Sequence, residues 1–88
     1  MVMATAYADI LSRPGLGLRD RSQITCIVLA VQEHEKELRV HLRGLANQGV
    51  IRLEAEEMMI HISIYIGWPK ALEARRIMTE VFDELKIS

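Results

Sequence analysis

Two dense apolar runs constrain this chain more than any other feature of its sequence. They are ITCIVLAV at residues 24–31 and MMIHISIYIGW at residues 58–68. The chain has 88 residues, of which half are apolar. A domain of this size buries only about 60–65% of the surface that its unfolded chain exposes. One copy therefore has too little interior for both runs, which predicts a homo-oligomer whose interfaces complete the core.

The composition excludes several classes of protein. Charged residues make up 26% of the chain and the formal net charge is −1, so no excess of positive charge is available for a nucleic-acid backbone. One cysteine cannot form an intrachain disulfide. No apolar run reaches the roughly 18–20 residues of a membrane-spanning helix, and the first residues lack the basic region of a secretory signal. We expect one domain over residues 1–88, located in the cytoplasm, with no nucleic-acid or membrane partner.

Hydrophobic periodicity predicts an all-α chain. The segment at 35–47 is the clearest helix, because its apolar residues follow the i, i+3, i+4, i+7 spacing of one helical face. The isoleucines at 60–66 alternate with other residues as in a strand, but the preceding Glu-Ala-Glu-Glu-Met-Met favours a helix. The predicted helices cover residues 4–12, from caps at Asp20 and Ser22 to about Gln32, 35–47, 53–66, and from Pro69 onward.

Two apolar stripes at helical spacing indicate that the last two segments are helices. Their members are Ala55, Met58, Met59, Ile62 and Tyr65 in the first, and Ala74, Met78, Val81 and Leu85 in the second. The last helix is also expected to carry an i, i+4 ion pair between Arg76 and Glu80.

Three segments together resemble the carboxymuconolactone decarboxylase family, which is related to the alkylhydroperoxidase D (AhpD-like) proteins. The segments are LGLRDRS at 16–22, ELRVHLRG at 37–44 with NQG at 47–49, and HISIYIGWP at 61–69. Their order and spacing carry the resemblance over nearly the whole chain from about residue 9. The resemblance implies an all-α fold with a central antiparallel helix pair, assembled into trimers or hexamers.

The sequence departs from the peroxidase branch of this family. That branch uses a Cys-x-x-Cys motif with a His four residues after the second Cys, and counting back from His41 puts these cysteines at His34 and Glu37. A Glu that usually precedes the motif would fall near Ser22. The dithiol chemistry is therefore missing. Ile51 stands where relatives often place a Thr helix cap, which predicts a less well satisfied helix start, and the chain is short for the family.

The resemblance implies a cofactor-independent decarboxylase of a carboxymuconolactone-like γ-carboxy lactone. His41 and Glu37 are the expected catalytic pair, because they lie one helical turn apart and the carboxylate favours an imidazolium that can donate a proton near neutral pH. Arginine suits a substrate carboxylate. The expected substrate-binding residues are Arg43, Arg21, His61 and Tyr65.

The expected partner is a small-molecule carboxylic acid or lactone, and no cofactor is expected because the conjugated substrate is its own electron sink. We expect no metal site. The spacing of the three histidines, at 34, 41 and 61, matches no compact set of metal ligands.

Each of these residues also has a structural interpretation. His41 would then be satisfied at a helix or subunit contact, and His61 and Tyr65 would form an interface pair. Cys26 lies in an apolar run and is interpreted as a small buried hydrophobe, since a reactive thiol needs exposure and positive neighbours. Two alternative functions follow: a non-catalytic oligomeric AhpD-like helical module, and third a thiol peroxidase, which the absent cysteine pair disfavours.

Overall fold

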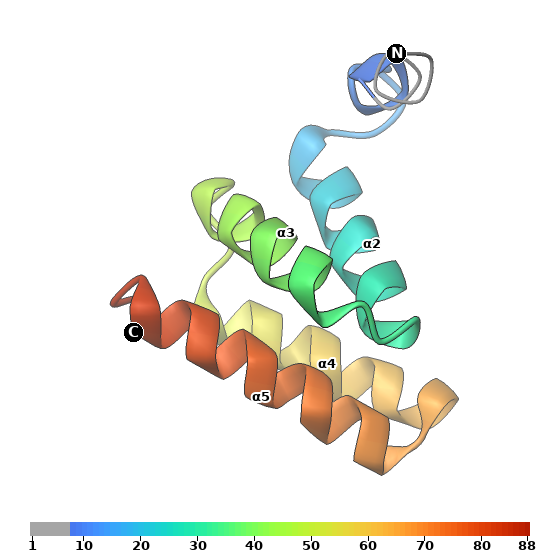
Figure 1. The fold of residues 1–88 in the computed structure, drawn as a ribbon. Helices are drawn as coiled ribbons and strands as arrows, with labels where there is room; N and C mark the ends of the chain where they lie inside the picture. Colours follow the sequence, from blue (N-terminus) through green and yellow to red (C-terminus); the bar gives the residue numbers. More distant parts are fainter. Residues whose placement is uncertain (1–7) are drawn as a thin grey trace.

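The structure is a computed structural model that describes residues 8–88. Every regular element in this part of the chain is an α-helix (Figure 1), which confirms the predicted fold class. Residues 8–11 are helical and Ser12 follows in a turn, while residues 4–7 of the helix expected at 4–12 lie outside the described residues. The main helices are α2 (Leu18–Val31), α3 (Glu35–Asn47), α4 (Arg52–Ile66) and α5 (Trp68–Glu84).

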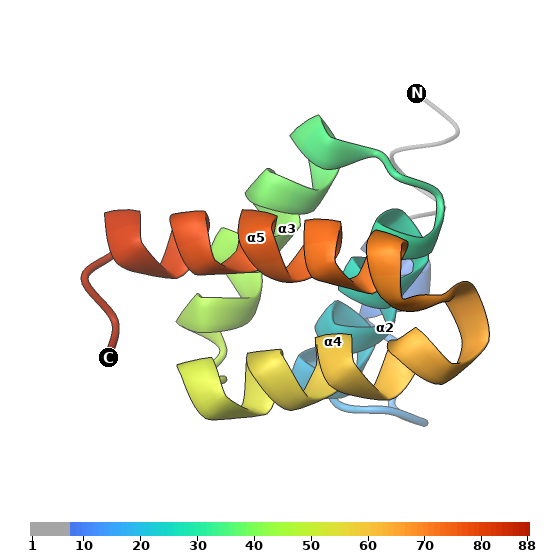
Figure 2. The ribbon, with the colours of Figure 1, turned by 90° about the horizontal axis from the view of Figure 1, so that it is seen from below.

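An antiparallel helix pair, α4 and α5, forms one side of the molecule (Figures 1 and 2). Gly67 joins the two helices with a φ of 89°, a left-handed backbone conformation that favours glycine. α3 packs on α2 and α5, while α2 also contacts α4. Residues 8–11 lie beside the first turns of α2, away from the other helices (Figure 1). None of the helices among residues 8–88 is long and apolar enough to cross a membrane.

One apolar core is shared by all four helices. α2 contributes Cys26 and Ala30, and α3 contributes the three leucines of its predicted stripe. The largest fully buried side chains are Phe82, Leu38, Leu42, Leu45, Met59, Met78, Val50, Val81 and Cys26. The described residues bury no polar or charged residue in this core, so its stability comes from apolar packing.

The strand-like alternation at 60–66 lies within α4, as the upstream residues predicted. Tyr65, which the sequence places on one helical stripe with Ile62, is 74% exposed. A step of three residues falls about 60° short of a full helical turn, which rotates Tyr65 away from the face defined by Ile62. Ile66, four residues after Ile62, packs against the core instead.

Helix ends agree with the prediction at some positions and differ at others. α2 begins at Leu18 with Gly17 as its N-cap, so the predicted caps at Asp20 and Ser22 were wrong. Asp20 lies in the first turn, where a carboxylate interacts favourably with the helix dipole. α5 ends at Glu84, so Leu85, which was expected to line this helix, is its C-cap residue and is 39% exposed.

The start of α4 is incompletely capped, as predicted from Ile51. Ile51 is the N-cap residue, and its aliphatic side chain cannot accept a hydrogen bond from the first turn. Glu54 supplies the other half of a capping box, because its Oε1 accepts a hydrogen bond of 3.1 Å from the Ile51 N–H.

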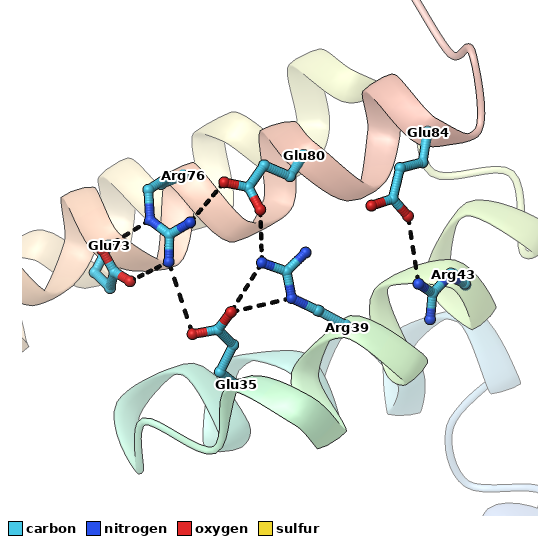
Figure 3. Close-up of polar contacts among 7 residues, drawn as sticks. All are labelled: Glu35, Arg39, Arg43, Glu73, Arg76, Glu80 and Glu84. Atoms are coloured by element: carbon cyan, nitrogen blue, oxygen red, sulfur yellow. Dashed lines mark hydrogen bonds and ion pairs between the residues drawn. The ribbon is translucent and has the colours of Figure 1, made fainter.

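A network of ion pairs connects α3 to α5 (Figure 3). Arg39 of α3 lies 2.8 Å from Glu35 and 2.6 Å from Glu80 of α5. Arg76 of α5 pairs with Glu80, which confirms that prediction, and also with Glu73 and with Glu35 at 3.7 Å. The network therefore bridges the two helices at a partly exposed surface.

Candidate active site

The predicted catalytic pair lies on α3. Leu38 and Leu42 of this helix are fully buried, which fixes the direction of its inner face. His41 is half-buried at the edge of that face, and Glu37 is exposed. An i, i+4 spacing puts their side chains on the same side of the helix. The imidazole is thus placed at the border between apolar interior and solvent.

Both predicted arginines already interact with protein groups. Arg21 is half-buried and its guanidinium donates to the backbone carbonyls of Leu16, at 3.3 Å, and Arg13, at 3.4 Å. It therefore holds the loop before α2 against that helix. Arg43 pairs with Glu84 of α5 at 3.4 Å (Figure 3), and both side chains are exposed. An exposed pair of this kind contributes little energy, so a substrate carboxylate could replace Glu84.

His61 and Tyr65 lie one turn apart on α4 and contact each other. Their ring centroids are 5.7 Å apart with an angle of 55° between the ring planes. His61 lines an open groove of about 560 Å³ between α2 and α4. The other lining residues are Ile27, Leu53, Glu54, Glu57, Met58 and Ile62. This volume is within the range of small-molecule sites, and most of the wall is apolar.

The structure places the predicted site residues on three helices. Arg21 is on α2, three residues are on α3, and His61 and Tyr65 are on α4. The groove includes His61 but neither His41 nor Glu37. The structure thus presents two candidate surfaces, the edge of α3 at His41 and the groove between α2 and α4.

Sequence reasoning missed the acidic residues of the groove. Glu57 precedes His61 by four residues, the same spacing that singled out Glu37 and His41, so a signal was present. Glu54, near the start of α4, forms an ion pair with Arg19, near the start of α2. That pair joins two helices and depends on their packing, so the sequence alone did not indicate it.

Cys26 has the environment predicted for an unreactive thiol. Its side chain is fully buried in the core, and burial raises the pKa of the thiol to about 12. A neutral thiol is a poor nucleophile, so this cysteine is not prepared for redox chemistry. Among residues 8–88, no group of three His, Cys, Asp or Glu side chains is arranged to hold a metal ion.

A sequence model of the carboxymuconolactone decarboxylase family matches residues 1–80. The chain belongs to this family. The resemblance based on the three segments is thereby confirmed. The family match covers the part of the chain that carries α2, α3, α4 and most of α5, including both candidate surfaces.

Two curated relatives are both decarboxylases by name. The chain is 41% identical over 83 residues to a 4-carboxymuconolactone decarboxylase of Acinetobacter baylyi, with 94% of this chain and 62% of the relative covered. It is 31% identical over 85 residues to a nitrosuccinic acid decarboxylase of Metarhizium robertsii, with 97% of this chain and 59% of the relative covered. The chain therefore spans about six tenths of the length of these relatives.

Proposed function

We propose that this protein is a cofactor-independent decarboxylase of a carboxymuconolactone-like γ-carboxy lactone, acting in the cytoplasm. The observation that carries the proposal is the similarity of nearly the whole chain to two relatives that are both named as decarboxylases. The names of their substrates describe acids in which a carbonyl or a nitro group can accept the electron pair left by departing carbon dioxide. This shared chemistry is the reason for proposing the reaction type.

The proposed reaction has two steps. The bond between the γ-carbon and its carboxylate breaks, and the electron pair moves through the conjugated double bond to the lactone carbonyl, which releases carbon dioxide and leaves a dienolate. A proton donor then forms a C–H bond and quenches the dienolate. The protein must hold the substrate anion, stabilise the dienolate oxygen and deliver one proton.

His41 is the proposed proton donor, and Glu37 is the proposed positioning residue one turn before it. A half-buried imidazole at an apolar edge has access to both solvent and a surface of low polarity, as a proton donor requires. Arg43 stays a predicted substrate-carboxylate ligand, since its partner Glu84 is exposed and exchangeable, but it lies on the other side of α3 from His41. Arg21 supports the loop before α2. His61 lines the groove between α2 and α4, a surface separate from His41 within one copy, so substrate binding by His61 and Tyr65 stays a prediction.

The protein is further proposed to act as a homo-oligomer, a trimer or a hexamer. Fifteen large apolar side chains are at least one-third exposed in the described part of one copy, and several have more than half of their surface in solvent. They include Leu53, Ile64, Tyr65 and Val40. Association would cover part of this surface, and the same domain over residues 1–88 is proposed as the unit that associates.

The other two functions are less well supported. A thiol peroxidase requires a reactive cysteine pair, and the lone Cys26 is buried and protonated. A non-catalytic helical module would keep the fold without turnover, and both named relatives argue against it.

The proposal is tested by measuring carbon dioxide release from 4-carboxymuconolactone and, separately, from nitrosuccinate. We expect release from the lactone that scales with protein concentration and is absent when the protein is heat-denatured. Release from nitrosuccinate alone would change the proposed substrate. No release from either acid by a folded sample would favour the non-catalytic module.

A further inference from the structure

The ion pairs that connect α3 to α5 are evenly spaced along both helices (Figure 3). Three pairs cross between the helices, and they are Glu35–Arg76 at 3.7 Å, Arg39–Glu80 at 2.6 Å and Arg43–Glu84 at 3.4 Å. In every pair the two residues are 41 positions apart in sequence, so each pair follows the previous one by four residues on both helices. Four residues are about one helical turn. We name these three pairs the α3–α5 row.

The order of charges in the α3–α5 row fits one register of α3 along α5. If α3 slides one turn toward the start of α5, Arg39 moves from Glu80 to Arg76, which brings two cations together. If it slides one turn the other way, Glu35 moves from Arg76 to Glu80, which brings two carboxylates together. The charges therefore disfavour both neighbouring registers.

The buried face of α3 specifies this register less strongly. It presents Leu38, Leu42 and Leu45 to the core, and a slide of one turn puts Leu42 where Leu38 was. Replacing one leucine by another in a core changes little volume, so apolar packing discriminates weakly between the two positions. Exposed ion pairs add little to the free energy of unfolding, but like charges brought together disfavour an arrangement. Among the arginines of the row, Arg39 is the least exposed, at 23% against 45% for the other two.

We propose that the α3–α5 row fixes the register of α3 and thereby positions His41, so that Arg39 and Glu80 are positioning residues of the reaction. The role in the reaction rests on the proposed function, whereas the register does not. His41 lies on α3 within the residues that the row spans. A slide of one turn would carry its imidazole about 5.4 Å along the helix. A misplacement of about 1 Å can lower a rate by roughly 10²-fold, so a proton donor on α3 needs a fixed register.

Two charge reversals test the register, because each one favours a different neighbouring register. In Arg39→Glu, the introduced carboxylate faces Glu80 in the native register, whereas a slide of one turn brings it to Arg76. The same slide brings Arg43 to Glu80. In Glu80→Arg, the introduced guanidinium faces Arg39 in the native register, whereas the opposite slide brings it to Glu35. Combining both reversals in one chain restores opposite charges at positions 39 and 80, so the native register should return.

The register is measured as the distance between two spin labels by electron paramagnetic resonance. Val40→Cys on α3 and Leu72→Cys near the start of α5 provide the sites, because these side chains are 58% and 43% exposed. Cys26 is fully buried and does not take a label. Labelled chains are diluted with unlabelled ones, so that only distances within one chain are recorded. Arg39→Glu should shorten the distance, Glu80→Arg should lengthen it, and the combined variant should return it to the wild-type value.

The positioning role is measured as turnover of 4-carboxymuconolactone. Each single reversal should lower kcat by roughly tenfold or more, because the proton donor is displaced. The solvent deuterium isotope effect on kcat should rise, since proton delivery to carbon becomes the slow step. A sample that only contains fewer folded molecules would keep the isotope effect of wild type. The combined variant should recover kcat to within about threefold of wild type.

Lys36→Glu is the matched control, because it reverses an exposed charge on α3 outside the α3–α5 row. It should keep the wild-type distance and kcat, and circular dichroism verifies that every variant is folded. The proposal is overturned if neither single reversal changes the distance, or if the combined variant does not restore it. A changed distance with wild-type kcat would overturn the positioning role. An inactive wild type would overturn the proposed function and the positioning role together, while the distances would still decide the register.

Discussion

His41 and Cys26 occupy opposite environments within the same small bundle. Cys26 is sealed in the core, while His41 lies where the core meets solvent. A proton donor needs access to both a low-polarity site and a proton source, and only the second position offers this. The burial of Cys26 could be predicted from its apolar neighbours in sequence. The role of His41 could not be, because a half-buried histidine serves structure and catalysis equally well.

The proposed role of His41 predicts a large kinetic effect. His41→Ala should lower the turnover of a carboxymuconolactone by roughly 10²–10⁴-fold, the usual contribution of one general acid. Glu37→Gln should cost less, because the amide can still orient the ring. His34→Ala, at an exposed histidine before α3, is the control and should retain activity. Full activity of a folded His41→Ala variant would remove this residue from the mechanism.

The environment of Cys26 predicts a thiol that does not react until the protein unfolds. Burial raises its pKa from 9.0 to about 12, so at pH 8 the native protein should not react with Ellman's reagent, and one thiol should react in denaturant. Because the unfolded thiol ionises first, this group destabilises the fold as pH rises above 9 toward 12. No dithiol-dependent peroxide consumption should be seen. Rapid labelling of the native protein would contradict this assignment.

At the scale of elements, the sequence predicted which segments are helical, but it did not predict the residues at which several of these helices begin or end. α3 has the predicted bounds because a clear apolar stripe and a following Gly-containing turn define it. α2 starts earlier than predicted, since Asp20 fits the first turn of a helix as well as it fits a cap. The ion pair between Arg39 of α3 and Glu80 of α5 joins residues 41 positions apart, and only packing brings them together.

The start of α4 offers a stability test. Ile51→Thr should raise the free energy of unfolding by about 1 kcal/mol, because a threonine oxygen can accept the first-turn N–H that Ile51 leaves without a side-chain partner. Ile51 is 53% exposed, so little apolar contact is lost. Urea denaturation provides the measurement, and Ile51→Ala is the control that should not stabilise. An unchanged or lower stability of Ile51→Thr would mean that the cap is already satisfied.

The network between α3 and α5 predicts sensitivity to acid. Hydrogen bonds from Arg76 lower the pKa of Glu73, and hydrogen bonds from Arg39 and Arg76 lower the pKa of Glu80, both from an ordinary value of 4.5. These carboxylates stabilise the fold above pH 4.5, and the contribution is lost as pH falls below that value because the unfolded state binds more protons. Thermal melts should therefore show a falling midpoint below pH 4.5.

The control for this network is Glu80→Gln, which removes one carboxylate shared by both arginines. The variant should show a smaller fall in melting midpoint over the same pH range than wild type. High salt should also reduce the difference, since these groups are exposed and screened. An identical acid dependence in the variant would assign the effect to other carboxylates.

At the scale of the whole molecule, family membership and an all-helical fold were predictable, and the site was not. Three short segments in register were enough to identify the family, because their spacing reflects one arrangement of helices. The residues proposed for catalysis and substrate binding lie on separate helices, and the order of residues along the chain does not state which surfaces meet. Ile60 and Ile64 of α4 illustrate the same limit, since they look like core residues in the sequence, and only the fold shows that they lie on the exposed side of the helix.

The central claim is that this chain removes a carboxylate and replaces it with a proton from the protein. The most direct measurement is nuclear magnetic resonance of 4-carboxymuconolactone incubated with the wild-type protein in deuterium oxide. We expect loss of one carbon dioxide per substrate and one deuterium bound to carbon in the product. A substrate that remains unchanged in the presence of folded, associated protein would contradict the claim.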